Sequence, residues 1–268
     1  MKNGLLTIPD NGEIEAVRGQ GIRERAVLHE WPLSRVERIT WTDGSTAIVK
    51  TQLTMASAER AFYRSRKDPA LLSPLADGVC GDCDWMLLED LGSAQEDWSG
   101  FTDEAIRERV RALRPLIRRL DGAEVPVFFD FQTPEKLVEA CLGILPTLRE
   151  AGIPKEELDA LLDWAEHDAR VLWDSPAVLL HGDLKGENVV PRGSGWVLLD
   201  WQRPMRGPES LDEELALLLA DRKSRGMATA LARFVMGYWY AWAYRTCLPV
   251  PFVLGMAGKM IRGIPGTL

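Results

Sequence analysis

Hydrophobic and polar residues alternate with the period of a β-strand in the first third of the chain, where Arg25 to Gln52 reads as strands. The alternation predicts one strand over residues 35–41 and a second over 46–50, joined by the Asp-Gly turn of Thr42–Ser45. A short helix is expected from Ser57 to Lys67, and a buried strand is expected over residues 84–88. These elements predict a small antiparallel sheet.

The remainder of the chain follows a helical period, interrupted by one island of short apolar strands within residues 177–199. Residues 1–20 show no clear periodicity and predict no element. Helices are predicted over residues 102–120, 134–150, 155–173 and 210–245. A strand-rich first third followed by a helix-rich remainder predicts an α+β fold with two lobes.

The composition is that of an ordinary globular protein, with 268 residues, 46% hydrophobic and 27% charged. A formal net charge of −8 repels phosphate backbones and argues against a nucleic-acid partner. The first residues contain no apolar core long enough for a signal peptide. The strongest apolar run, Phe234–Tyr244, falls short of the ~20 residues that span a membrane and predicts a buried helix. We therefore expect a cytoplasmic protein.

Two of the four cysteines form the motif Cys80-Gly-Asp-Cys83. This spacing matches half of a zinc site or a redox pair, but neither a second cysteine pair nor a nearby histidine completes a metal shell. We interpret them as two reduced thiols in a loop.

The strand island carries the residues on which chemistry can depend. Its first strand leads into His181-Gly182-Asp183, Asn188 follows five residues after the aspartate, and a later apolar strand ends at Asp200. Phosphoryl transfer needs a carboxylate that accepts or orients the proton of the attacking hydroxyl, and Asp183 can serve. Mg²⁺ takes oxygen ligands, which Asn188 and Asp200 can supply.

The motif His-Gly-Asp-x-x-x-x-Asn, followed by an apolar strand and Asp200-Trp201, resembles the catalytic and metal-binding loops of the aminoglycoside phosphotransferase family. These relatives of the protein kinases phosphorylate small molecules. The resemblance implies a protein-kinase-like fold with a small antiparallel-sheet N-lobe over residues 1–88, a hinge over 89–93, and a mainly helical C-lobe over 94–268 that holds the catalytic loop and substrate pocket. It also implies ATP, with GTP not excluded, and Mg²⁺ as cofactors.

The family predicts further parts of the site. A lysine should close the third strand, and Lys50 stands there; Glu59, on the following helix, should pair with it and position it on the nucleotide phosphates. The alternative for Glu59 is a solvated helix carboxylate. Lys185 would reach the γ-phosphate, unless it is an exposed loop lysine. At the hinge, backbone groups of Glu89 and Leu91 would pair with the adenine edge.

One departure concerns the loop that covers the phosphates in protein kinases, which is rich in glycine. The matching turn of this chain, Trp31–Arg35, has no glycine. Ser34 is the candidate phosphate contact in it, with an ordinary turn serine as the alternative.

Two sets of residues near the C-terminus allow more than one interpretation. The acidic run Glu209, Asp212, Glu213 and Glu214 could line a pocket for a cation, but a capping box, Ser210-x-x-Glu213, explains it more simply. Either Asp212 or Glu214 could match a structural acidic residue of the family. The aromatic residues Trp239 and Trp242 share a helix face and belong either to the core or to the substrate pocket.

The sequence thus predicts an enzyme that transfers the γ-phosphate of ATP to a hydroxyl of a small molecule. An antibiotic leads as the acceptor, either an aminoglycoside or another sugar- or nucleoside-containing compound, which would give resistance or self-protection. A kinase of a metabolic alcohol, such as choline or an amino sugar, is the alternative, followed by an inactive kinase-like binding module. A protein kinase is disfavoured because Trp201-Gln202 follows Asp200 and no Ala-Pro-Glu appears after it. The oligomeric state is not indicated.

Overall fold

The computed structural model describes residues 6–92, 95–122 and 124–264, which divide into two compact units. The first contains the described residues of Met1–Glu96 and Ala123–Phe128, together with Gly186–Arg203. The second contains Asp97–Gly122, Phe129–Lys185 and the described residues from Pro204 onward. The predicted α+β class is confirmed, because an antiparallel sheet occupies the first part of the chain and helices dominate the rest.

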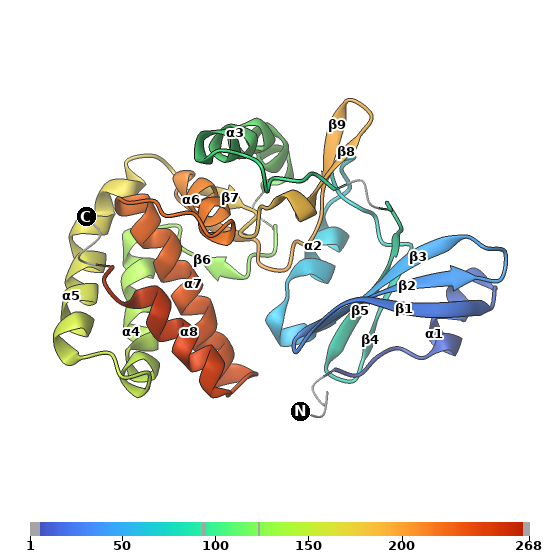
Figure 1. Ribbon diagram of the computed structural model, residues 1–268, viewed down its shortest axis with the longest axis horizontal. Helices are drawn as coiled ribbons and strands as arrows, with labels where there is room; N and C mark the ends of the chain where they lie inside the picture. Colours follow the sequence, from blue (N-terminus) through green and yellow to red (C-terminus); the bar gives the residue numbers. More distant parts are fainter. Residues whose placement is uncertain (1–5, 93–94, 123, 265–268) are drawn as a thin grey trace. The chain divides into compact units, whose positions relative to one another are not determined.

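The first unit is built on a five-stranded antiparallel sheet of order β1-β2-β3-β5-β4 (Figure 1). The strands are β1 (Ile22–Trp31), β2 (Ser34–Trp41), β3 (Thr46–Leu53), β4 (Ala76–Cys80) and β5 (Cys83–Glu89). The predicted β2–β3 hairpin is present, and Gly44 in its turn has a φ of 86°, in the left-handed region that favours glycine. Lys50 does not close its strand as expected, because β3 continues for three further residues.

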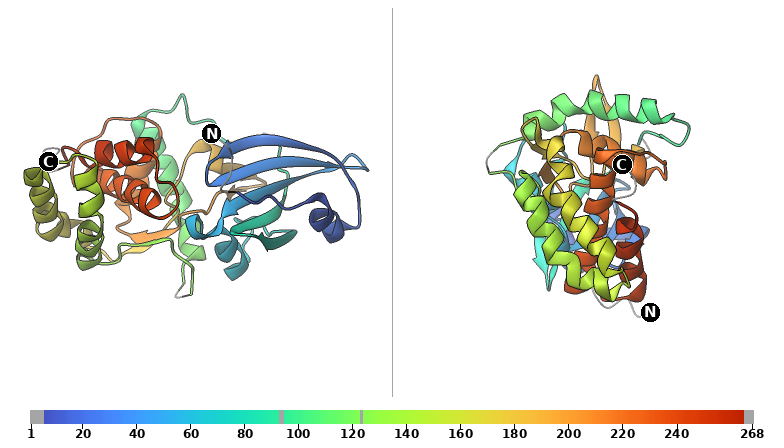
Figure 2. Two further views of the ribbon diagram at one scale, coloured as in Figure 1. Left: turned by 90° about the horizontal axis from the view of Figure 1, so that it is seen from below. Right: turned by 90° about the vertical axis from the view of Figure 1, so that its left-hand side faces the viewer.

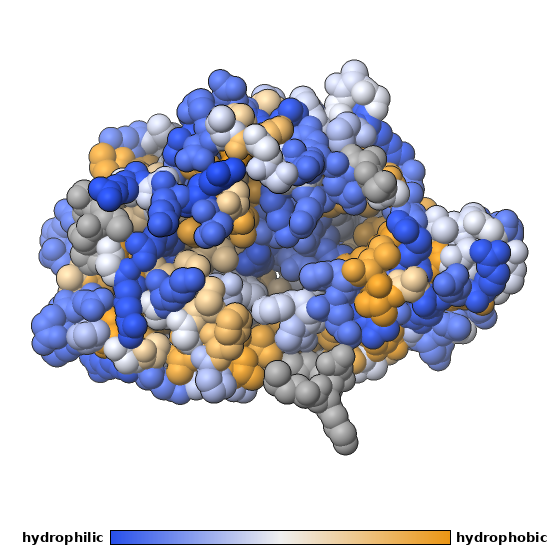
Figure 3. Space-filling model, viewed as in Figure 1, coloured by the Kyte–Doolittle hydropathy of each residue, from blue (hydrophilic) through white to orange (hydrophobic). Residues whose placement is uncertain are grey.

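The edge strand β1 exposes Val27 and Leu28, and hydrophobic residues gather on the surface over this part of the sheet (Figure 3). The other face of the sheet is covered by α1 (Asn11–Arg18), whose Ile14 is fully buried with Trp41 and Val49.

The prediction that residues 1–20 form no element was wrong, because α1 lies within them. The Asp10 carboxylate accepts a hydrogen bond from the Glu13 N–H at 2.8 Å, and the Glu13 carboxylate accepts from the Asp10 N–H at 3.1 Å. This reciprocal capping box, together with a left-handed Gly19 at the helix end, is a signal that the sequence carries.

Four smaller elements complete the first unit: η1 (Thr54–Ala56), α2 (Glu59–Ser65), η3 (Gly186–Asn188) and the hairpin of β8 (Val189–Arg192) with β9 (Gly195–Leu198). Helix α2 is shorter at both ends than predicted. Cys80 and Cys83 face each other across the tight turn between β4 and β5. Neither forms a disulfide, which agrees with the predicted reduced thiols, but both lie at strand ends and not in a loop.

The second unit is mainly helical, and Figures 1 and 2 show α4, α5, α7 and α8 packed together. Its helices are α3 (Asp103–Leu120), α4 (Pro134–Glu150), α5 (Lys155–Glu166), η2 (Asp168–Trp173), α6 (Ser210–Leu219), α7 (Met227–Thr246) and α8 (Pro251–Ile261). The helices predicted over 102–120 and 134–150 agree within a residue. The predicted helix over 210–245 is divided into α6 and α7, and α8 was not predicted.

A short three-stranded sheet of order β6-β10-β7 crosses the second unit, and its strand β7 leads into His181-Gly182-Asp183. Its strands are β6 (Phe129–Asp130), β7 (Val178–Leu180) and β10 (Met205–Gly207). Phe234 of α7 is fully buried and packs against the rings of Phe131 and Trp164, which are also fully buried. Trp239 is buried and Trp242 half-buried, so Trp239 belongs to the core. Within the part of the chain that the structure describes, none of the helices combines the length and apolar character needed to cross a membrane.

Candidate active site

A buried lysine links two carboxylates in the first unit. The Lys50 ammonium, on β3, donates a hydrogen bond to Asp200 Oδ1 at 2.5 Å and lies 2.6 Å from Glu59 Oε2. Lys50 and Asp200 are 150 residues apart in the sequence. Burial alone would lower the pKa of Lys50, but the charges of Asp200 and Glu59 outweigh it and raise that pKa. Lys50 therefore remains a cation, and the predicted partner Glu59 is within ion-pair distance.

Two carboxylates, those of Glu59 and Asp200, lie within ion-pair distance of the Lys50 ammonium. Glu59 is only 1% exposed; burial raises its pKa, Lys50 opposes this, and the Asp200 charge adds to it.

The hairpin of β8 and β9 brings Asn188 and Asp200 together. Asn188 directly precedes β8, Asp200 follows β9, and Val189 pairs with Leu198 in the register. The Leu199 N–H also donates to the Asn188 carbonyl at 2.9 Å. A carboxamide and a carboxylate thus lie at the same end of the hairpin. Both present the oxygen donors that Mg²⁺ prefers.

The donor set fits a magnesium ion that shares its coordination with a nucleotide. The described residues contain no group of three or more His, Cys, Asp or Glu side chains able to hold a metal by themselves. Mg²⁺ is commonly held by one or two protein ligands, with phosphate oxygens and waters completing its octahedron. Asn188 and Asp200 meet this requirement.

Helix α2 holds the segment that carries Asp200. The rings of Phe62 and Trp201 stack with centroids 4.1 Å apart and planes within 10°, and both residues are fully buried. The Ala58 N–H donates to the Gln202 carbonyl at 2.9 Å. Asp200 has a φ of 65°, a left-handed conformation that residues other than glycine adopt only when their surroundings impose it. These contacts supply that constraint.

His181, Gly182 and Asp183 lie in the second unit, directly after β7. The N–H groups of His181 and Gly182 donate to Asp212 Oδ2 and Oδ1, each at 3.0 Å, and the buried Asp183 follows. Gly182 has a φ of 79°, which accounts for glycine at this position. Burial raises the pKa of Asp212 to about 6, although the two N–H groups oppose the increase. Asp212 therefore anchors the backbone that presents Asp183.

The choice between Asp212 and Glu214, which the sequence left open, is decided by these contacts. Glu214 instead accepts hydrogen bonds from Arg107 at 3.0 Å and from Thr229 at 2.8 Å. A buried carboxylate that accepts from two consecutive N–H groups is invisible in a single sequence because the residues lie 30 positions apart.

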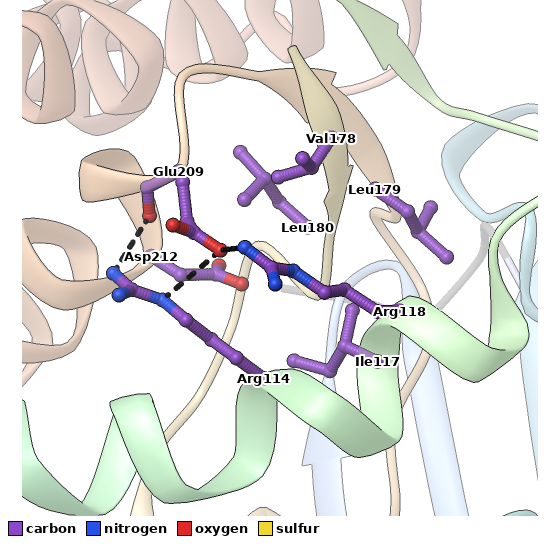
Figure 4. A pocket seen from close by; sticks show the side chains of 8 residues that line it. All are labelled: Arg114, Ile117, Arg118, Val178, Leu179, Leu180, Glu209 and Asp212. Atoms are coloured by element: carbon purple, nitrogen blue, oxygen red, sulfur yellow. Dashed lines mark hydrogen bonds and ion pairs between the residues drawn. The ribbon is translucent and has the colours of Figure 1, made fainter. Parts of the chain in front are cut away.

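The predicted capping box at Ser210 and Glu213 is wrong. The N-cap of α6 is Glu209, which makes no side-chain capping bond. Glu213 pairs instead with Arg111 at 2.9 Å and with Arg114, and Glu209 pairs with Arg118 at 2.5 Å. Figure 4 shows Arg114 and Arg118 reaching from α3 toward Glu209 beside a small cavity. The acidic run therefore joins α6 to the arginines of α3.

Comparison with known proteins identifies the family of the chain. A model of the phosphotransferase enzyme family (APH) matches residues 67–249, more than half of the chain. The chain belongs to this family. It is a small-molecule phosphotransferase that acts on an alcohol group, as the sequence predicted. No curated protein matches it in a sequence search.

Solved structures share the fold of this phosphotransferase at low sequence identity. Macrolide 2′-phosphotransferase MphH from Brachybacterium faecium is 15% identical, with a TM-score of 0.59 over 93% of this chain and 96% of that one. A choline/ethanolamine kinase family protein from Mesorhizobium loti is 14% identical, with a TM-score of 0.55 over 90% and 87%. Amicoumacin kinase hAmiN, in complex with AMP-PNP, Ca²⁺ and Ami, is 11% identical, with a TM-score of 0.54 over 99% and 91%.

Other predicted site residues of the phosphotransferase lie on the strands and loops of both units. Lys185, in the loop after Asp183, is half-buried. Ser34 is buried as the first residue of β2, opposite Trp31 across a two-residue turn and paired with Gln52 of β3.

The hinge prediction covers residues 89–93, of which residue 93 lies outside the described part of the chain. Glu89 is exposed and pairs with Arg192 at 3.1 Å, and Leu91 is half-buried. Asp90 accepts from Arg38 at 2.7 Å. The carboxylates of Glu89 and Asp90 are therefore both bound to arginines. The lobe boundaries at residues 88 and 94 stay a prediction.

Proposed function

We propose that this phosphotransferase transfers the γ-phosphate of ATP, with Mg²⁺, to a hydroxyl of an antibiotic that carries a sugar or nucleoside. The observation that supports the nucleotide half most strongly is the buried Lys50, bound to both Glu59 and Asp200. The folds of a macrolide phosphotransferase and of an amicoumacin kinase bound to AMP-PNP support the choice of ATP and of an antibiotic acceptor. Because ATP is the donor, we place the reaction in the cytoplasm.

In this proposal the first unit binds the nucleotide. Lys50, held by Glu59, positions the α- and β-phosphates, and the backbone at Glu89 and Leu91 pairs with the base. Asn188 and Asp200 would hold Mg²⁺, which would neutralise charge on the phosphates. Ser34, whose position at the start of β2 is buried, would serve as a phosphate contact.

The second unit supplies the base. Asp183 accepts the proton of the attacking hydroxyl, and Lys185 binds the γ-phosphate. Asp212 keeps the loop in one conformation, because both of its oxygens are occupied by N–H groups that directly precede Asp183. Proton transfer by a positioned carboxylate contributes about 10²–10⁴-fold to a rate.

A kinase of a metabolic alcohol is the second candidate, supported by the fold of a choline/ethanolamine kinase family protein. A quaternary ammonium acceptor would need carboxylates or aromatic faces around it. In the acidic run of α6, Glu209, Glu213 and Glu214 are already paired with arginines. This run therefore adds no support for a cationic acceptor, and an antibiotic is the preferred class.

A phosphate-transfer screen tests the proposed function. The enzyme is incubated with MgATP or MgGTP and with single acceptors, namely aminoglycosides, macrolides, nucleoside antibiotics, choline, ethanolamine and amino sugars, and each product is weighed by mass spectrometry. Gain of one phosphate by an antibiotic supports the proposal. Transfer to choline or an amino sugar alone would assign the second candidate in its place.

A further inference from the structure

A buried glutamine lies beside the Lys50–Glu59 pair. Gln52 follows Lys50 by two residues on β3, so both side chains leave the same face of the strand. Gln52 is 1% exposed, and its Nε2 donates to Glu59 Oε2 at 2.5 Å. The same oxygen lies 2.6 Å from the Lys50 ammonium. Glu59 is thus held by two donors from one strand.

The orientation of the Gln52 amide is fixed by Ser57. The Ser57 hydroxyl donates to Gln52 Oε1 at 2.5 Å, so the Nε2 group of Gln52 must face Glu59. The same hydroxyl accepts a hydrogen bond from the Glu59 N–H at 3.1 Å. Ser57, Gln52 and Glu59 therefore form a closed ring of hydrogen bonds at the start of α2.

This ring of hydrogen bonds links the Gln52 side chain of β3 to the start of helix α2. Helix α2 has seven residues, and its N-cap, Ala58, makes no side-chain capping bond. So short a helix depends on tertiary contacts for its placement. The amide N–H₂ group of Gln52 is bound to Glu59, in the first turn of α2, and its carbonyl oxygen to Ser57, just before the helix. The Gln52 side chain therefore fixes the start of α2 relative to β3.

We infer that Gln52, oriented by Ser57, is a positioning residue for the phosphotransfer reaction: it holds Glu59 where Glu59 can direct Lys50. The inference rests on the proposed function in one respect, the role of Lys50 at the nucleotide phosphates. Loss of the Gln52 donor removes one of the groups that hold the deeply buried Glu59 carboxylate beside the Lys50 ammonium, with Asp200, a like charge, nearby. Glu59 then loses a defined orientation, and Lys50 turns toward Asp200.

A double-mutant cycle in the full-length enzyme tests this inference. Gln52→Met keeps the length of the side chain and removes both polar groups. We expect the Kd for MgATP, measured by calorimetry, to rise about tenfold, the effect of losing one hydrogen bond to a charged group. In a Glu59→Met background the same substitution should change that Kd by less than about twofold, because the two residues act in one chain of contacts. Independent effects that multiply would overturn the inference.

Control variants separate this role from simple destabilisation. Thr51→Val alters the neighbouring buried residue on the opposite face of β3, whose hydroxyl has no hydrogen-bond partner within the described residues, and should leave the Kd unchanged. Ser57→Ala should weaken MgATP binding in the same direction as Gln52→Met, and it serves if Gln52→Met does not fold. An unchanged Kd in Ser57→Ala and Gln52→Met alike, with Lys50→Met inactive, would refute the positioning role alone. An active Lys50→Met would refute the proposed role of Lys50.

Discussion

The anchoring of the catalytic loop by Asp212 can be tested with a single substitution, Asp212→Asn. The carboxylate uses one oxygen for the His181 N–H and the other for the Gly182 N–H. Asparagine retains one acceptor oxygen and turns an N–H₂ group toward the second N–H donor. One charge-assisted hydrogen bond, worth about 1.5–3 kcal/mol, is lost, and a buried N–H is left without an acceptor, which costs about 1–3 kcal/mol more.

An opposing term reduces the effect on overall stability. Burial raises the pKa of Asp212 from 3.8 to about 6, and this shift corresponds to about 3 kcal/mol of destabilisation at pH 7 that asparagine does not carry. Subtracting this gain from the cost of about 2.5–6 kcal/mol, we expect the free energy of unfolding at pH 7 to fall by no more than about 3 kcal/mol. The kcat of the folded enzyme should fall by about 10²-fold, because Asp183 loses its defined position.

The assay combines three readouts on the purified variant. These are kcat with the acceptor found in the screen, urea unfolding at pH 7, and hydrogen exchange of the peptide that contains His181 and Gly182. Glu213→Gln is the matched control, because it alters a buried acid on the same helix that binds arginines of α3 and not the loop. A wild-type kcat in Asp212→Asn, or a loss of kcat that only matches the unfolded fraction, would refute the anchoring role.

Three further predictions concern the titration of Asp212, the stack of Trp201 on Phe62, and Asn188. Because the folded protein binds a proton at Asp212 more tightly than the unfolded chain, wild-type stability relative to Asp212→Asn should fall by up to about 3 kcal/mol as pH rises from about 4 to above 6; a constant difference in urea unfolding would contradict this. Trp201→Ala removes the stack on Phe62 and should cost about 3–5 kcal/mol in unfolding free energy, measured by thermal or urea denaturation, together with weaker MgATP binding; a cost under about 1 kcal/mol would show that the stack is not a core contact. Chelation should abolish transfer and excess Mg²⁺ restore it, and Asn188→Leu should raise the half-saturating Mg²⁺ concentration about tenfold or more; an unchanged Mg²⁺ titration would remove Asn188 from the metal site.

The features that could be predicted from the sequence are those that depend on residues close together in the chain. The motif from His181 to Asn188 and the apolar strand before Asp200 are local patterns, and they were enough to predict the family. The β2–β3 hairpin and the helices at 102–120 and 134–150 also follow from local periodicity and turn chemistry. Lys50 and Glu59 could be predicted only through the resemblance to the family, because they are too far from the motif to be linked to it by spacing.

The features that were missed depend on partners distant in the sequence. In the sequence Gln52 is an ordinary polar residue of a predicted strand, and only the structure shows its hydrogen bonds to Ser57 and Glu59. Asp212 could not be distinguished from Glu214 because the choice depends on which carboxylate meets the loop at His181. The capping box failed because four arginines of α3, spaced to lie on one helix face, compete for the same acids. Helix α1 is the exception, since its capping box is visible in the sequence.

The most direct test of the central claim is phosphate transfer by Asp183→Asn. The substitution preserves shape and removes the proton acceptor. With the acceptor found in the screen and saturating MgATP, we expect transfer to fall by about 10²–10⁴-fold while the Kd for MgATP stays within about twofold of wild type. Transfer at the wild-type rate would contradict the assignment of Asp183 as the catalytic base.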